Sequence, residues 1–264
     1  MTDAFLERGL RFRVEGPVAT ITLSRPETRN AQSPAMWTAL REIERAMPDD
    51  VRVVVINAEG KSFSSGLDRR MWTPEGVPGE MSFLEMEGLS DDKVAEVISG
   101  YQSAFTWLRR PELITIAAVQ GHAIGAGFQL ALACDFRVLA EDARFAMLET
   151  TLGLVPDLGG TQPLVEAIGY PRALEICVTG RWVDADEARS LGLATIVVAR
   201  EDMDGTVSDL AAAVTAPMHR AVTGTKTLLR TATNRDYAEQ LTAESAAQIS
   251  RIRDLAAIMR GRAG

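Results

Sequence analysis

Apolar and small polar side chains alternate in two short segments near the start of the chain. The alternation predicts strands over Leu10–Glu15 and Val18–Leu23, with Gly16-Pro17 as the turn between them. Val51–Ile56 is a β-branched run, which is typical of a buried strand. A sheet is therefore expected to begin early in the chain.

Helical spacing follows the second strand. Ser33 and Pro34 suit an N-cap and a first helical position, and Met36–Met47 then carries apolar side chains on one face. Asp91–Arg109 predicts another helix, and Leu113–Val119 another buried strand. The order strand, strand, helix therefore repeats.

Glycine divides the middle of the chain. Gly121–Gly127 predicts a turn that leads into an apolar helix over Phe128–Ala133, followed by a strand over Phe136–Ala140 and an extended piece over Ala143–Ala146. Met71–Ser90 holds several Gly and Pro residues without a clear period, which predicts a long surface loop.

Helices predominate after the glycine-rich segment Leu152–Gly160. The expected elements are helices beginning at Gly159-Gly160-Thr161 and over Pro171–Val178, a last strand over Ala194–Val198, and long helices over Pro217–Thr231 and Tyr237–Met259. We expect an α/β fold with a core over residues 1–200 and a helical part over residues 201–264. No linker composition separates the two parts, so they should pack together.

Composition narrows the class of protein. The 264 residues are 46% hydrophobic and 24% charged, and the net charge of −8 argues against a nucleic-acid binder. Two cysteines outside any CxxC pair and two histidines cannot supply a usual zinc site. No signal-peptide core and no run of 18 apolar residues occur, so we expect a cytoplasmic protein without a membrane span.

Two glycine-containing segments can present free backbone amides. In Lys61–Asp68, small residues and Gly66 let the backbone bend, so that the N–H of Leu67 can face a cleft. Gly121–Phe128 joins a buried strand to an apolar helix, whose N-terminus favours negative charge. This second segment superficially resembles a dinucleotide fingerprint, but it lies far into the chain and lacks the acidic residue expected after the next strand.

Two acidic residues follow these segments. Glu149 comes after an apolar stretch and Asp157 lies eight residues further on. If both face one cleft, burial would raise their pKa values and make them candidate acid/base groups.

Together these segments resemble the crotonase (enoyl-CoA hydratase/isomerase) superfamily, over essentially the whole chain. The resemblance is carried by the order of Arg25-Pro26-Glu27 with Asn30-Ala31, Phe63–Asp68, Ala118–Gly127, Glu149–Thr161, and Thr179–Arg181 with Ala185–Gly192. It implies a spiral of ββα repeats with a C-terminal helical region used in assembly, as a homotrimer or a dimer of trimers.

The resemblance also implies the chemistry. The backbone N–H groups of Leu67 and Ala126 would bind the thioester oxygen of an acyl-CoA substrate while an enolate forms, and Glu149 and Asp157 would be the catalytic carboxylates. The implied substrate contacts are Arg25, Ser65, Gly66, Asp68, Arg69, Gly125, Gly127 and Gln129. No cofactor or metal is implied, because CoA is part of the substrate.

Gln129 separates the possible reactions. Family hydratases carry a second glutamate where this chain has Gln129, and an amide cannot take a proton from water as a carboxylate can. Family isomerases work with one glutamate at the position of Glu149, so the resemblance favours a double-bond-shifting isomerase. A hydratase with Gln129 orienting water and a non-catalytic acyl-CoA-binding protein remain alternatives.

Basic residues are candidates for the phosphates of CoA. Arg25 and the pair Arg69-Arg70 lie near the first amide segment. Lys226, on a C-terminal helix, is a candidate to approach the nucleotide end of CoA. For each of these arginines, a solvated surface position without a ligand contact is an equally good prediction.

Overall fold

The computed structural model describes residues 4–73 and 75–262, so residue 74 of the expected loop and the outermost residues of both expected parts lie outside it. A sheet of six strands has the order β1-β2-β3-β4-β6-β9. Its strands are β1 (Leu10–Glu15), β2 (Val18–Leu23), β3 (Val53–Ala58), β4 (Ile114–Val119), β6 (Phe136–Ala140) and β9 (Ile196–Val198). Only β1 and β2 pair antiparallel; the other neighbours are parallel.

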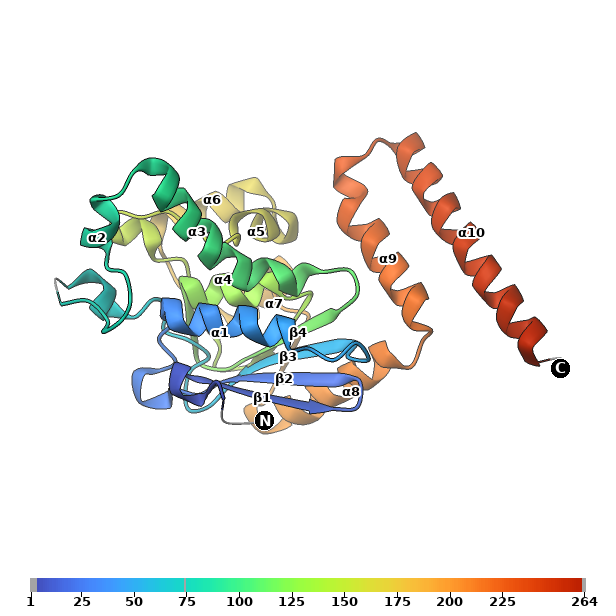
Figure 1. Ribbon diagram of the computed structural model, residues 1–264, viewed down its shortest axis with the longest axis horizontal. Helices are drawn as coiled ribbons and strands as arrows, with labels where there is room; N and C mark the ends of the chain where they lie inside the picture. Colours follow the sequence, from blue (N-terminus) through green and yellow to red (C-terminus); the bar gives the residue numbers. More distant parts are fainter. Residues whose placement is uncertain (1–3, 74, 263–264) are drawn as a thin grey trace.

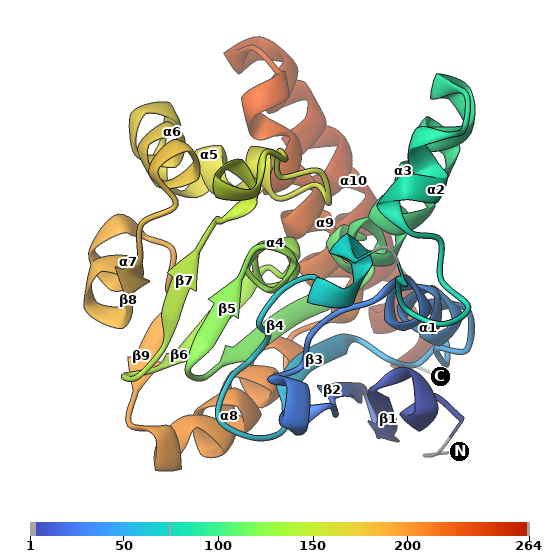
Figure 2. The same ribbon diagram turned by 90° about the vertical axis from the view of Figure 1, so that its left-hand side faces the viewer.

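A second sheet of three strands lies beside the first (Figure 2). It has the order β5-β7-β8, with β5 (His122–Ile124), β7 (Arg144–Ala146) and β8 (Val183–Asp184). β5 lies inside the segment for which the sequence predicts only a turn. That prediction is wrong because His122 to Ile124 pair with β7 and bridge to Ser64, which a local pattern does not reveal.

Helices cover the two faces of the larger sheet unequally. The described α-helices are α1 (Pro34–Arg45), α2 (Phe83–Glu87), α3 (Asp91–Thr106), α4 (Ala126–Ala133), α5 (Thr161–Ile168), α6 (Tyr170–Thr179), α7 (Ala185–Leu191), α8 (Met203–Thr215), α9 (His219–Thr231) and α10 (Tyr237–Arg262). α1, α3 and α4 share the larger core with one sheet face, and α8 packs on the other face. In β3, Val54 and Ile56 enter the first core and Val53 and Val55 the second, as expected for a strand buried on both faces.

The N-terminal part of α1 follows the sequence prediction. Ser33 is the N-cap, its side chain accepts a hydrogen bond from Met36 N, and Pro34 is at the first helical position. The apolar face, including Met36, Leu40 and Ile43, is buried in the larger core.

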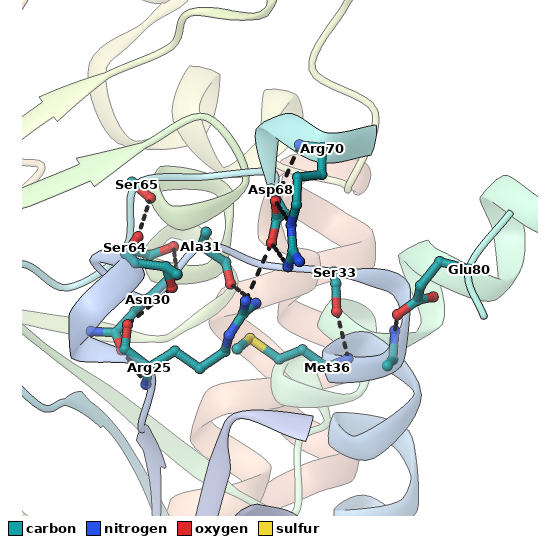
Figure 3. Close-up of polar contacts among 12 residues, drawn as sticks. Arg25, Asn30, Ala31, Ser33, Met36, Ser64, Ser65, Asp68, Arg70 and Glu80 are labelled. Atoms are coloured by element: carbon teal, nitrogen blue, oxygen red, sulfur yellow. Dashed lines mark hydrogen bonds and ion pairs between the residues drawn. The ribbon is translucent and has the colours of Figure 1, made fainter. Parts of the chain in front are cut away.

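The segment 71–90 is more structured than the sequence predicts. It contains the end of a 3-10 helix (Arg69–Trp72) and the short helix α2, which starts with a capping box between Ser82 and Glu85. The expectation of an irregular loop is wrong here because a five-residue helix is too short to give a periodic pattern. The Glu80 carboxylate accepts from Ala35 N at 2.7 Å, which ties this segment to the start of α1 (Figure 3).

The last helices leave the body of the protein. α8 packs under the sheet, whereas α9 and α10 form an arm that extends from the body (Figure 1). α10 packs on α9 and exposes several large apolar side chains. The division at residue 200 and the role of residues 201–264 in assembly stay predictions. Within the described ranges, no helix combines the length and apolar character that a bilayer span requires.

Candidate active site

The segment 63–68 leaves one backbone amide free. Phe63 N donates to Gln120 O, Ser64 N to His122 O and Ser65 N to Arg29 O. Gly66 N donates to Ser64 Oγ at 3.2 Å and Asp68 N to Gln32 O at 2.7 Å. The N–H of Leu67 donates to no group in the described residues.

The free amide follows from the pairing of the strand. Leu67 forms a parallel bridge with Gln32, and in such a bridge the flanking residues make the hydrogen bonds. Gly66 O and Asp68 N therefore face Gln32, while the N–H of Leu67 faces the opposite side.

A second set of free amides lies at the start of α4. Gly125 joins β5 to α4 with φ +50°, a conformation that favours glycine, and its N–H donates to Ala146 O at 2.9 Å. Gln129 N makes the first bond of the helix, to Gly125 O, so the N–H of Ala126 has no intrahelical acceptor. The helix dipole makes this end favourable for negative charge.

The two segments lie against each other. A Cβ on Gly66, which has φ +84°, would lie 2.7 Å from Ile124 O and 3.7 Å from Ala126 N. A Cβ on Gly127 would lie 2.7 Å from the Ser64 Cβ. Both glycines are needed for this close approach, which brings the Leu67 segment to the N-terminus of α4.

Glu149 lies beside the same turn. A Cβ on Gly125 would lie 3.3 Å from Glu149 Oε1, and Gln129 Nε2 donates to Oε1 at 2.7 Å. Oε2 is buried and has no partner in the described residues. Burial raises the pKa of Glu149, the bond from Gln129 opposes the shift, and the charge of Asp157 adds to it.

The orientation of the Gln129 amide is fixed on both sides. Its Oε1 accepts from Leu158 N at 2.9 Å and from Gly160 N at 3.3 Å, so its Nε2 must face Glu149. A Cβ on Gly160 would lie 2.7 Å from Gln129 Cγ, so glycine is required there. Gln129 therefore holds Glu149 and the segment after Asp157 together.

Asp157 is half-buried on that segment. Its backbone oxygen accepts from Gln102 Nε2 at 2.8 Å, which ties it to α3. Burial raises the pKa of Asp157. Because its charge acts on Glu149, the two carboxylates lie close enough to interact.

Asp68 binds two of the candidate arginines (Figure 3). Its carboxylate accepts from Arg70 Nη2 at 2.8 Å and from Arg25 Nη2 at 3.3 Å, and Arg25 Nη1 donates to Ala31 O at 2.9 Å. Chiefly because of the Arg70 side-chain bond, and in part because of Arg25, the pKa of Asp68 is lowered to about 2. Arg69 is exposed and forms no ion pair within the described residues, and Ser65 Oγ donates to Thr28 O.

Lys226 is not available as a surface contact. Its Nζ is buried and donates to Asp135 Oδ2 at 2.7 Å and to Leu113 O at 2.6 Å. The proposed approach to the nucleotide is therefore wrong: the side chain turns inward and anchors α9 to the body.

The sequence patterns assign no role to two buried polar residues of the site. Gln32 donates to Ser64 Oγ at 3.1 Å, and Ser64 Oγ donates to Asn30 O at 2.8 Å. Both side chains are fully buried. The sequence could have indicated Gln32 and Ser64 by one feature: each is a polar residue within a segment that pairs as a strand. A polar side chain buried there needs hydrogen-bond partners. No group of His, Cys, Asp and Glu suited to a metal ion occurs in the described part of the chain.

Comparison with known proteins identifies the family of this chain. The family model described as enoyl-CoA hydratase/isomerase matches residues 13–257. A "Probable enoyl-CoA hydratase" of Rhizobium meliloti is 35% identical over 72% of this chain and 68% of its own. The peroxisomal Delta(3,5)-Delta(2,4)-dienoyl-CoA isomerase of Arabidopsis thaliana is 31% identical over 83% of this chain and 80% of its own.

Solved structures agree over more of the chain. A structure described as "a putative enoyl-CoA hydratase" of Thermobifida fusca YX in complex with CoA has a TM-score of 0.92 and 47% identity, and covers 97% of both chains. The enoyl-CoA hydratase of Bacillus anthracis has a TM-score of 0.79 and 28% identity, and covers 96% of both chains. The chain belongs to the enoyl-CoA hydratase/isomerase family, within the crotonase superfamily.

Proposed function

We propose that the protein shifts a carbon–carbon double bond in an acyl-CoA thioester, with Glu149 as the base. The observation that carries the proposal is the surroundings of this carboxylate. Oε1 is held by the Gln129 amide at 2.7 Å, and Oε2 is buried with no partner among the residues that the structure describes. A carboxylate held in this way can remove a proton from one carbon and return it to another.

The free amides supply the second requirement. Removing a proton next to a thioester leaves an enolate, whose charge develops on the carbonyl oxygen. We assign the N–H groups of Leu67 and Ala126 as the donors to that oxygen, supported by the close approach of Gly66 to Ala126 N. Loss of one such donor typically costs roughly 2.7–4 kcal/mol of transition-state stabilisation.

Asp157 is assigned as a helper or alternate acid. Its pKa is raised by burial, so it can hold a proton closer to neutral pH than an exposed aspartate. It lies near enough for its charge to raise the pKa of Glu149. A proton shuttle between two carbons can use such a neighbour.

Hydration is the second candidate, because several relatives are described as enoyl-CoA hydratases. It would need a group that activates water beside Glu149. Both acceptor positions of Gln129 Oε1 are already used by Leu158 N and Gly160 N. Gln129 could orient water only by donating its remaining Nε2 hydrogen, which makes hydration the weaker proposal.

The contacts that we propose for the CoA part of the ligand rest on exposed arginine side chains. Arg70 and Arg69 are exposed beside the first amide segment, and we assign them to the phosphates of CoA. Asp68 holds both Arg25 and Arg70, and Arg25 also donates to Ala31 O, so Arg69 is the most mobile of the three candidates for this contact. A homotrimer or dimer of trimers is proposed on the exposed apolar side chains of α10, and no cofactor is proposed.

The test compares two reactions in the wild type and in Gln129→Glu. We expect wild type to isomerise 3-enoyl-CoA faster than it hydrates 2-enoyl-CoA. In Gln129→Glu, isomerisation should fall about tenfold, because the Nε2 donor to Glu149 is replaced by a second carboxylate. Hydration should rise relative to isomerisation.

Two outcomes would contradict the proposal. Faster hydration than isomerisation by the wild type would favour the hydratase. Tight acyl-CoA binding with neither reaction would favour the non-catalytic acyl-CoA-binding protein. Asn234→Asp is the matched control, since it also converts an amide to a carboxylate, at an exposed position just after α9 and outside the proposed site.

A further inference from the structure

We propose that Ser64 is a positioning residue that sets the separation of the two amide donors, Leu67 N–H and Ala126 N–H, and that Gln32 orients it. The proposal rests on the oxyanion-binding role assigned above. Ser64 touches both segments that carry a donor. Among the described residues its hydroxyl bonds to Gln32, Asn30 and Gly66 and not to Glu149, and by this assignment it does not contact the substrate.

The hydroxyl of Ser64 holds the first donor segment. Ser64 Oγ accepts from Gly66 N at 3.2 Å, one residue before Leu67. It also donates to Asn30 O at 2.8 Å, which is visible in Figure 3, and accepts from Gln32 Nε2 at 3.1 Å. The hydroxyl therefore uses its one donor and both acceptor positions.

The rest of Ser64 holds the second donor segment. Ser64 N donates to His122 O at 2.9 Å, and Ser64 O accepts from Ile124 N at 3.0 Å. The Cβ position of Gly127 lies only 2.7 Å from Ser64 Cβ and 2.8 Å from Ser64 O. Ser64 thus packs directly against the first turn of α4, next to Ala126.

Gln32 fixes the direction of this network. Trp37 Nε1 can only donate, and it donates to Gln32 Oε1 at 2.8 Å. The other end of the amide, Nε2, must then face Ser64 Oγ and donate to it. The Ser64 proton is directed to Asn30 O, which leaves a lone pair for Gly66 N.

The backbone of Gln32 acts on the same loop. Gln32 N donates to Gly66 O and Asp68 N donates to Gln32 O, both at 2.7 Å. Trp37, Gln32 and Ser64 are all buried, so water does not compete for these bonds. The network therefore fixes the backbone on both sides of Leu67.

Geometry of this kind matters for the chemistry. Donors must lie about 2.7–3.1 Å from the developing oxyanion, and a shift of about 1 Å can cost roughly 100-fold in rate. A hydroxyl that sets this separation acts on the transition state more than on ligand binding.

The test uses Ser64→Ala and Gln32→Met. We expect kcat for isomerisation of 3-enoyl-CoA to fall about tenfold in each variant, while KM changes less than about twofold. The double variant should lose little more than Ser64→Ala alone, because both changes act through one hydroxyl. Ser62→Ala is the matched control: Ser62 is also buried in this segment, but its hydroxyl faces His122.

A spectroscopic readout separates positioning from general stability. The infrared carbonyl band of bound butyryl-CoA, labelled with ¹³C at the thioester carbon, reports polarisation by the two donors. We expect a shift to lower frequency in wild type and Ser62→Ala, and a smaller shift in Ser64→Ala and Gln32→Met. Because the band reports only bound, folded protein, it remains informative if one variant is less stable.

The two possible failures give different results. A full shift and wild-type kcat in both variants would overturn the positioning role and leave the proposed function intact. No shift in the wild type would overturn the oxyanion-binding role itself, and with it this inference.

Discussion

The segments around Ser64 and the arm formed by α9 and α10 differ in how their side chains are accommodated. Around Ser64, the buried side chains of Gln32 and Gln129 find their hydrogen-bond partners within the same chain. On α10, Leu241, Ile252 and Met259 are exposed on one side of the helix at helical spacing. The polar side chains around Ser64 are thus satisfied within this chain, whereas α10 leaves apolar side chains exposed, and the assembly proposed above would cover them.

Replacing Glu149 should give the largest effect on the site. In Glu149→Gln we expect kcat for isomerisation of 3-enoyl-CoA to fall about 1,000-fold, because the proton acceptor is lost. Steady-state kinetics checks this, with Glu166→Gln, in the exposed ion pair with Arg109, as the control.

The same variant should not lose stability. Burial raises the folded-state pKa of Glu149 above its value in the unfolded chain. The favourable contribution of this side chain to the free energy of unfolding is therefore present below the unfolded-state pKa and is lost as pH rises through the folded-state pKa. At neutral pH the neutral amide should therefore keep or raise the midpoint of urea unfolding. Activity within a few-fold of wild type would remove Glu149 from the mechanism.

A charge introduced on α10 should give the next largest effect, which is on the assembly of the protein through the arm. In Ile252→Glu we expect an assembly of lower mass, because a fully buried isoleucine contributes about 1.5–3 kcal/mol and a charge cannot replace it. Light scattering after size-exclusion chromatography gives the mass. Ser250→Glu, which places the same charge at an exposed polar position of the same helix, is the control. A wild-type protein that is already monomeric would contradict the assembly proposed for the arm.

Lys226 connects the arm to the body of the protein. In Lys226→Met we expect the free energy of unfolding to fall by about 2–3 kcal/mol, because Asp135 loses its buried partner while keeping Thr115. Urea unfolding measures the change. Arg220→Met is matched on the same helix, and its exposed pair with Asp254 should be worth less than about 1 kcal/mol. Equal losses in both variants would contradict the anchoring role of Lys226.

Asp157 should give the smallest change. Its negative charge raises the pKa of Glu149, so in Asp157→Asn that pKa should fall and the acid limb of kcat/KM should move to lower pH. Profiles of kcat/KM against pH measure the shift, and exposed Asp186→Asn is the control. An unmoved acid limb would mean that the two carboxylates do not interact in the working enzyme.

The sequence predicts the parts of the site that depend on local patterns. The buried strand before Gln120 and the apolar helix after Gly125 follow from their composition, and the free amides follow from the family resemblance. β5 and α2 were missed, because one pairs with distant strands and the other is too short to show a period.

The polar networks could not be predicted because their members are far apart in the chain. Gln32 and Ser64 are separated by 32 positions, and Asp135 and Lys226 by 91. Only the folded arrangement brings them within hydrogen-bond distance. The fixed orientation of Gln129 likewise depends on two backbone amides about thirty positions away.

A crystal structure of Glu149→Gln with a bound saturated acyl-CoA would test the central claim most directly. We expect the thioester oxygen to lie about 3 Å from both Leu67 N and Ala126 N, with the adjacent carbon facing residue 149. A thioester oxygen bound by other groups, or a carbon chain directed away from residue 149, would contradict the account.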